Sequence, residues 1–134
     1  MTTNILHALK ATTFATILHW SAFAVFTYIF GYAALYKILK VPGMMNGMMA
    51  MGFNESWTIA IGVAETIGVL ALLAGIFFPA LKNAAVLWLM PFAIGAFTAH
   101  MCYQHGFGHY CNSLLVCVLS VVILLTDKRF SLSL

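Results

Sequence analysis

Four long apolar runs constrain what this chain can fold into more than any other feature. They cover roughly residues 14–39, 57–78, 84–103 and 110–126. Each approaches the roughly 20 residues that a helix needs to cross about 30 Å of hydrocarbon. Apolar residues are continuous rather than alternating along them, which excludes a transmembrane β-barrel. Because backbone groups in lipid must be satisfied internally, the sequence predicts an all-α, integral membrane bundle of four transmembrane helices.

The scarcity of charge excludes an ordinary soluble domain. Only 7% of the residues are charged and 63% are hydrophobic, whereas soluble domains carry about 25% charged residues. Pro, Gly and charged residues gather in the breaks at 40–43, 79–83 and 104–109. We therefore expect residues 1–134 to form one domain. We expect no cleaved signal peptide, because the first apolar run is longer than the roughly 7–15 residues of a signal-peptide core.

The basic residues predict the orientation in the membrane. Four spans place both termini on one side, and that side holds four of the six basic residues: Lys10, Lys82, Lys128 and Arg129. The opposite side holds Lys37 and Lys40. The positive-inside rule then predicts cytoplasmic termini, in a bacterial inner membrane or, as the alternative, an organellar membrane. The net charge of +3 arises from these flanking residues, so we expect the lipid bilayer as a partner and no nucleic acid.

Glu65 is the most informative polar residue inside the predicted membrane region. A carboxyl at that depth is costly unless it is paired, protonated or faces a wet cavity. Gly62, Gly68 and Gly75 lie near it at helical spacing, and small residues let a second helix approach closely. Glu65 should therefore face the interior of the bundle. It is either a protonatable group in a ligand pocket or a structural carboxyl bonded to a neighbouring helix.

Lys37 and His100 are expected near Glu65. Antiparallel helices place all three in the outer half of the membrane, where the Lys37 ammonium can pair with Glu65 and His100 can join the same pocket. Taken singly, Lys37 could instead be a lysine that extends to the interface, and His100 a packing residue. In the inner half we single out only His19, and we expect no comparable cluster there.

The motifs that carry these residues resemble the DoxX-like family of small four-helix membrane proteins. The resemblance covers about residues 31–125, through "GYAALYKIL", "IGVAETIGVLALLAG" and "GAFTAHMCYQHGFGHY". In that pattern Lys37 closes the first helix, Gly62 and Glu65 open the second, and a small-residue run ends in His100. The resemblance implies a polar cluster in the outer half of a four-helix bundle. Relatives include a membrane subunit of thiosulfate:quinone oxidoreductase, other redox-complex components and chaperones for receptor assembly.

These observations suggest a small membrane subunit of a redox or energy-converting complex. Its pocket of Lys37, Glu65 and His100 would bind a quinone or a similar amphipathic ligand. The alternative is a non-catalytic assembly subunit that packs against other membrane subunits. No independent catalytic motif appears, so any enzymatic role is at most that of a subunit of a quinone-linked oxidoreductase.

Two stretches rich in sulfur and histidine suggest further chemistry. Soft thioether ligands select Cu(I), and the copper candidates are Met44, Met45, Met48, Met49, His105 and His109. The alternative for the Met-rich stretch is a short cover, interfacial or re-entrant, over the bundle. Cys102 and Cys111 flank a short turn on the predicted outer face, where a disulfide is possible if their Cα atoms come within about 7 Å.

Overall fold

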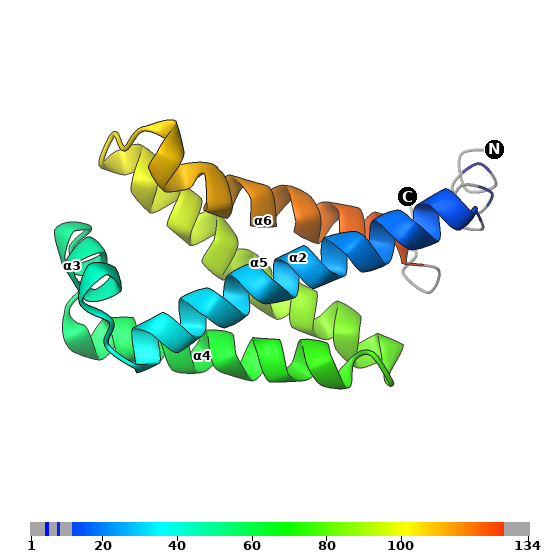
Figure 1. Cartoon of the computed structure of the whole chain (residues 1–134), viewed down its shortest axis with the longest axis horizontal. Helices are drawn as coiled ribbons and strands as arrows, with labels where there is room; N and C mark the ends of the chain where they lie inside the picture. The colour runs from blue at the N-terminus through cyan, green and yellow to red at the C-terminus, as the bar shows by residue number, and fades with distance from the viewer. Residues whose placement is uncertain (1–4, 6–7, 9–11, 128–134) are drawn as a thin grey trace.

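The computed structural model describes residues 5, 8 and 12–127 and is all-helical over that part of the chain (Figure 1). The helices are α2 (Thr13–Ile38), α3 (Pro42–Ala50), α4 (Glu55–Ala74), α5 (Pro79–Cys102) and α6 (Phe107–Thr126). All except α3 are long and apolar enough to cross a membrane. The predicted fold class, a four-helix integral membrane bundle, is therefore confirmed. Lys10, Lys128 and Arg129, which entered the prediction of orientation, lie outside the described residues.

The ends of the helices differ from the predicted ones where local signals compete with hydropathy. The second apolar run extends to residue 78, yet α4 ends at Ala74, with Gly75 as its C-cap. The stretch 79–83, predicted as a connection, is the first turn of α5, because proline is favoured at the first helical position. Helix α6 begins at Phe107 directly after Gly106, three residues before the predicted start.

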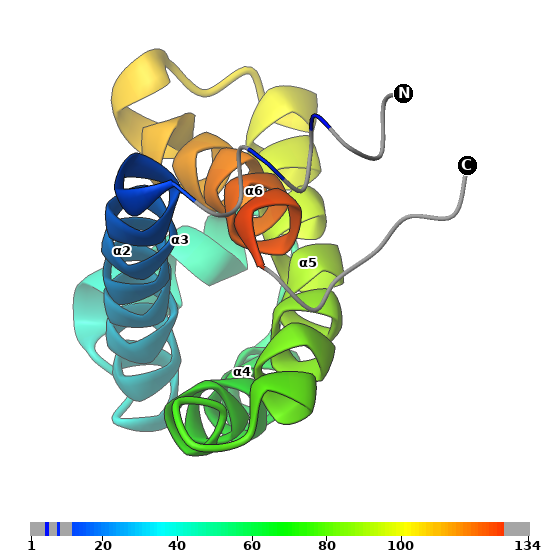
Figure 2. The ribbon, with the colours of Figure 1, turned by 90° about the vertical axis from the view of Figure 1, so that its right-hand side faces the viewer.

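The four long helices form a closed ring. Helix α2 packs against α4 and α6, and α5 packs against the same two helices from the other side (Figure 2). Each helix places at least one large apolar side chain at 0% exposure in the core: Phe26, Leu72, Val86 and Leu89, and Ile123. Many large apolar side chains remain exposed on the outside of the ring, among them Ile67, Trp88 and Ile94. Such a surface requires a lipid bilayer around it.

The two ends of the ring differ, and we name them by what lies there. The start of α2, the α4–α5 turn and the end of α6 lie together at what we call the terminal end (Figure 1). The short helix α3 and the α5–α6 turn lie at the opposite end, the α3 end. Both ends of the described chain are thus on one side of the bundle, as four spans require.

Small residues let α4 approach its neighbours. A Cβ added at Gly62 would lie 2.8 Å from Lys37 Cβ, and one added at Gly75 would lie 2.5 Å from Lys82 Cα. At Gly68 the added atom would lie 2.5 Å from Leu89 Cδ2. These separations are shorter than any normal carbon–carbon contact, so the close packing of α4 on α2 and α5 depends on glycine at all three positions.

Candidate functional site

A buried ion pair joins α2 to α4 at the α3 end of the bundle. Lys37 belongs to the last turn of α2, and its Nζ lies 2.9 Å from Oε2 of Glu65. Their side chains are 8% and 6% exposed. Glu65 is the eleventh residue of α4, which places it roughly 15 Å along the helix at 1.5 Å per residue. Because α4 begins at Glu55, two residues before the predicted apolar run, Glu65 lies farther from the start of its helix than that run implies.

The same ion pair borders a cavity of about 440 Å³. Helices α2, α3, α5 and α6 contribute most of its wall. The polar residues on the wall include Lys37, Glu65, His100, His109, Asn112 and Ser113, and the aromatic ones are Phe30, Tyr32, Tyr36 and Phe92. The three residues predicted from the sequence to form a pocket therefore share one cavity. Their role as a ligand or proton site stays a prediction.

Helix α3 lies over this cavity and supplies sulfur to its wall. Met44 and Met48 of α3 line the cavity, as does Met51 directly after the helix, and Met48 is buried. The helix packs against α2 and α4. An exposed ion pair joins Lys40, which precedes α3, to Glu55, which follows it. The Met-rich stretch thus has the position of a cover over the bundle.

Two histidines come together at the α5–α6 turn. Gln104 has a positive φ of 55°, and this left-handed turn lets the His105 backbone N–H donate to the His100 carbonyl at 3.0 Å. The two Nδ1 atoms of these rings then lie 2.8 Å apart. The ring of His109 is 5.2 Å from that of His105, centroid to centroid. From the sequence, His105 was predicted only as a copper candidate, and its contact with His100 was not predicted.

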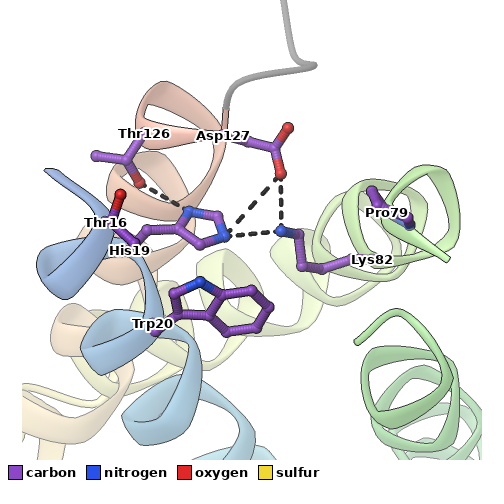
Figure 3. Close-up of a pocket in the computed structure, with 7 residues that line it drawn as sticks. All are labelled: Thr16, His19, Trp20, Pro79, Lys82, Thr126 and Asp127. Atoms are coloured by element: carbon purple, nitrogen blue, oxygen red, sulfur yellow. Dashed lines mark hydrogen bonds and ion pairs between the residues drawn. The ribbon is translucent and has the colours of Figure 1, made fainter. Parts of the chain in front are cut away.

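A second polar cluster lies at the terminal end, where we expected none (Figure 3). Lys82 Nζ lies 2.8 Å from Asp127 Oδ2 and 2.7 Å from His19 Nε2. His19 Nδ1 lies 2.9 Å from Thr126 Oγ1. His19, Lys82 and Asp127 are all buried, and they border a cavity of about 200 Å³. The expectation of no inner-half cluster was therefore wrong.

The hydrogen bonds of this terminal cluster define the state of His19. A lysine ammonium can only donate, so Nε2 of His19 accepts from Lys82 and carries no proton. The ring proton is then on Nδ1 and is donated to Thr126 Oγ1, whose own hydroxyl donates to the Val122 carbonyl at 2.6 Å. The Lys82 ammonium also lies 4.9 Å from the centre of the Trp20 ring, within cation–π range. The cluster thus ties α2, α5 and α6 together through matched donors and acceptors.

The sequence model of the DoxX-like family matches residues 21–123, which is most of the chain. The chain belongs to the DoxX-like family. No curated protein and no solved structure matches it. The family resemblance read from the sequence is confirmed, and with the four apolar helices it establishes a multi-pass membrane protein. The matched range contains Lys37, Glu65 and His100, whereas His19 and Asp127 of the terminal cluster lie outside it.

This DoxX-like chain does not gather the six copper candidates into one place. Met44, Met48 and His109 line the large cavity, whereas Met45, Met49 and His105 are not on its wall. Within residues 12–127 and the two described residues before them, no group of three or more His, Cys, Asp or Glu side chains could hold a metal ion. Copper binding has no support from this arrangement.

The sulfur atoms of the three cysteines of this DoxX-like protein are not joined to one another in this structure. Cys102 is exposed at the end of α5, and Cys111 is half-buried in the first turns of α6, where its Sγ donates to the Gly108 carbonyl at 3.7 Å. The Cys102–Cys111 disulfide stays a prediction. Cys117, farther along α6, is half-buried.

Proposed function

We propose that this DoxX-like protein is a membrane subunit of a redox or energy-converting complex, and that its large cavity binds a quinone or a similar amphipathic ligand. The single observation that carries the proposal is the combination of a buried ion pair, a histidine and aromatic side chains on one cavity wall. Its volume of about 440 Å³ lies within the range of roughly 300–1,000 Å³ typical of small-molecule sites.

Each polar residue has a distinct role in this proposal. The aromatic and aliphatic wall accommodates the ring and the start of an isoprenoid tail. His100 donates a hydrogen bond to a carbonyl oxygen of the ligand. Glu65 holds or relays a proton, and Lys37 balances its charge across the 2.9 Å contact.

Partner subunits complete the proposed activity. Nearly all of the described chain lies in helices, and four of these are long enough to cross the membrane. Under this proposal the electrons come from partner subunits. The apolar outer surface of the ring offers these partners helix contacts in the bilayer, in a bacterial inner membrane under this proposal.

The proposal is tested by binding of a short-chain benzoquinone to the protein in lipid nanodiscs, measured by calorimetry. We expect Glu65→Gln and His100→Ala each to weaken binding roughly tenfold, since one hydrogen bond to a ligand contributes about 1 kcal/mol and one to a charged group about 1.5–3 kcal/mol. Glu55→Gln is the matched control, because Glu55 is an exposed carboxyl that is not on the cavity wall. Absence of binding to the unmodified protein, or equal affinities in all variants, would contradict the proposal.

A second function is favoured by the way the polar clusters bond internally. Lys37 and Glu65 pair across α2 and α4, and the terminal cluster ties α2, α5 and α6. A non-catalytic assembly subunit would need only these ties and its apolar outer surface. In that case Glu65→Gln would lower stability and impair assembly, with no ligand effect. Extraction in mild detergent at native abundance, followed by sizing and mass spectrometry, identifies the partners under either function.

A further inference from the structure

His100 and His105 share one proton between their rings. Their Nδ1 atoms are 2.8 Å apart, which is a hydrogen-bonding distance. In a neutral imidazole one nitrogen carries a proton and the other accepts. One Nδ1 must therefore be protonated and the other bare. The ring whose Nδ1 accepts then carries its own proton on Nε2.

This constraint links the state of His100 to that of its neighbour. The Nδ1 atom of His100 is hydrogen-bonded to His105. Nε2 is therefore the nitrogen of His100 that can hydrogen-bond a ligand in the cavity. If His105 donates, Nε2 of His100 carries a proton and can donate to a carbonyl. If His100 donates to His105, Nε2 is bare and can accept from a hydroxyl. The two arrangements match the oxidised and reduced forms of a quinone.

We propose that His105 and His100 form a proton relay between water at the α3 end and a ligand oxygen in the cavity. The proposal rests on the ligand-binding function proposed above and adds the route by which protons arrive. His105 is half-buried in the turn, whereas His100 lies on the cavity wall. The pocket predicted from the sequence did not include His105.

The relay conserves protons and charge. The Nε2 proton of His100 passes to the ligand oxygen, and the Nδ1 proton of His105 replaces it at Nδ1 of His100. His105 then takes one proton from water at its own Nε2. Both rings are neutral before and after the transfer, and one proton has moved from water to the ligand. The reverse sequence returns a proton from a hydroxyl to water.

The surroundings favour exchange at the α3 end. The groups that face the pair are His109, with its ring 5.2 Å from that of His105, and Tyr103, with its ring at 6.3 Å. The charges of Lys37 and Glu65 on the same cavity wall compensate each other. Along the helices, the fully buried Phe26, Leu72 and Leu89 separate this cavity from the terminal cluster. That apolar layer insulates the relay from the other side of the membrane.

The first test needs no ligand. Protein with ¹⁵N-labelled histidine in nanodiscs should show a through-bond coupling between the two Nδ1 atoms and exchange of the His100 ring proton with water. A glutamine at 105 can hydrogen-bond His100 but cannot relay a proton. In His105→Gln we expect exchange to slow roughly a hundredfold, the lower end of the effect of a positioned proton-transfer group. The control is Cys102→Ser, because Cys102 is exposed at the same turn and is not on the cavity wall. Its exchange should match that of the unmodified protein. Equal exchange in His105→Gln overturns the relay.

The second test uses a short-chain benzoquinone and its quinol. With the quinone bound, Nε2 of His100 should be protonated, and with the quinol bound it should be bare, as read from the ring ¹⁵N shifts. If both forms bind and the shifts are identical, the relay is overturned while the proposed binding function stands. If neither form binds, the proposed function is overturned together with the delivery to a ligand, and the ligand-free exchange rates alone decide whether His105 carries protons to His100.

Discussion

The ammonium of Lys37 and the carboxylate of Glu65 meet at 2.9 Å, although the two residues lie on different membrane-spanning helices. Both side chains are almost completely buried. If one of them is removed, water therefore cannot take its place beside the remaining charge. Substitution of Lys37 or Glu65 alone leaves a buried charge without its partner, whereas substitution of both leaves no buried charge at this site. This asymmetry distinguishes the pair from ordinary surface ion pairs.

Removal of one charge from this pair should destabilise the bundle. We expect Glu65→Gln to lower the free energy of unfolding by about 3 kcal/mol, the usual cost of leaving a buried charge without its partner. The double variant Lys37→Met/Glu65→Gln should recover most of that loss. Thermal unfolding in a mild detergent, monitored by circular dichroism, measures both effects. Strictly additive losses in the double variant would show that the two charges are not coupled.

We expect the terminal cluster to contribute more to the free energy of unfolding than the exposed Lys40–Glu55 ion pair. Asp127→Asn removes the charge that faces buried Lys82 and should cost about 3 kcal/mol. Glu55→Gln breaks the pair with Lys40, whose side chains are 55% and 58% exposed, and should cost at most about 1 kcal/mol. The same thermal unfolding experiment compares them. Equal losses would argue against a structural role of the terminal cluster.

The glycines of α4 should tolerate no additional methyl group. In Gly75→Ala the new Cβ would lie 2.5 Å from the Cα of Lys82, a backbone atom that cannot rotate away. We expect a loss of about 1–3 kcal/mol, as for other overpacked sites. Gly95→Ala is the control, because no heavy atom lies within 4 Å of a Cβ added there. Unchanged unfolding temperatures in both variants would contradict the close packing of α4 on α5.

The predicted orientation can be tested with a thiol reagent that does not cross membranes. Cys102 is exposed at the α3 end, which the positive-inside rule predicts to lie on the non-cytoplasmic side of the membrane. In a Cys111→Ser/Cys117→Ser background, the reagent should label Cys102 in intact cells. Phe78→Cys, made in the same background with Cys102→Ser, places a thiol at the terminal end, and it should be labelled only after lysis. The opposite pattern would place the termini outside.

The fold was predictable because hydropathy and length decide it in a membrane protein. The errors lie at helix ends, where a single residue outweighs the average of a long apolar run. Pro79 starts α5 within a stretch that its lysine and asparagine suggested was a connection. Gly75 ends α4 while the apolar run continues to residue 78.

The two polar clusters differed in how visible they were in the sequence. Glu65 could be predicted as a site residue because a carboxylate deep in an apolar run is costly unless it has a partner. Lys37 and His100 could be predicted as its neighbours because they lie at a similar depth. Lys82 and Asp127 lie near helix ends, where charges normally mark topology, so each had an ordinary explanation. Depth in the membrane is the signal that could have predicted this cluster. His19 and Lys82 each lie within the first two turns of helices that start at the same end of the bundle.

The ring of helices also constrains how the protein is made. His19 contacts Thr126 at the end of α6, so the ring cannot close until translation has passed that residue. His19 and Lys82 enter the membrane earlier, before their partners Thr126 and Asp127 at the end of α6 have been synthesised. A nascent chain that stops short of α6 therefore holds an imidazole and an ammonium in lipid without the threonine and the carboxylate that they bind in the finished bundle.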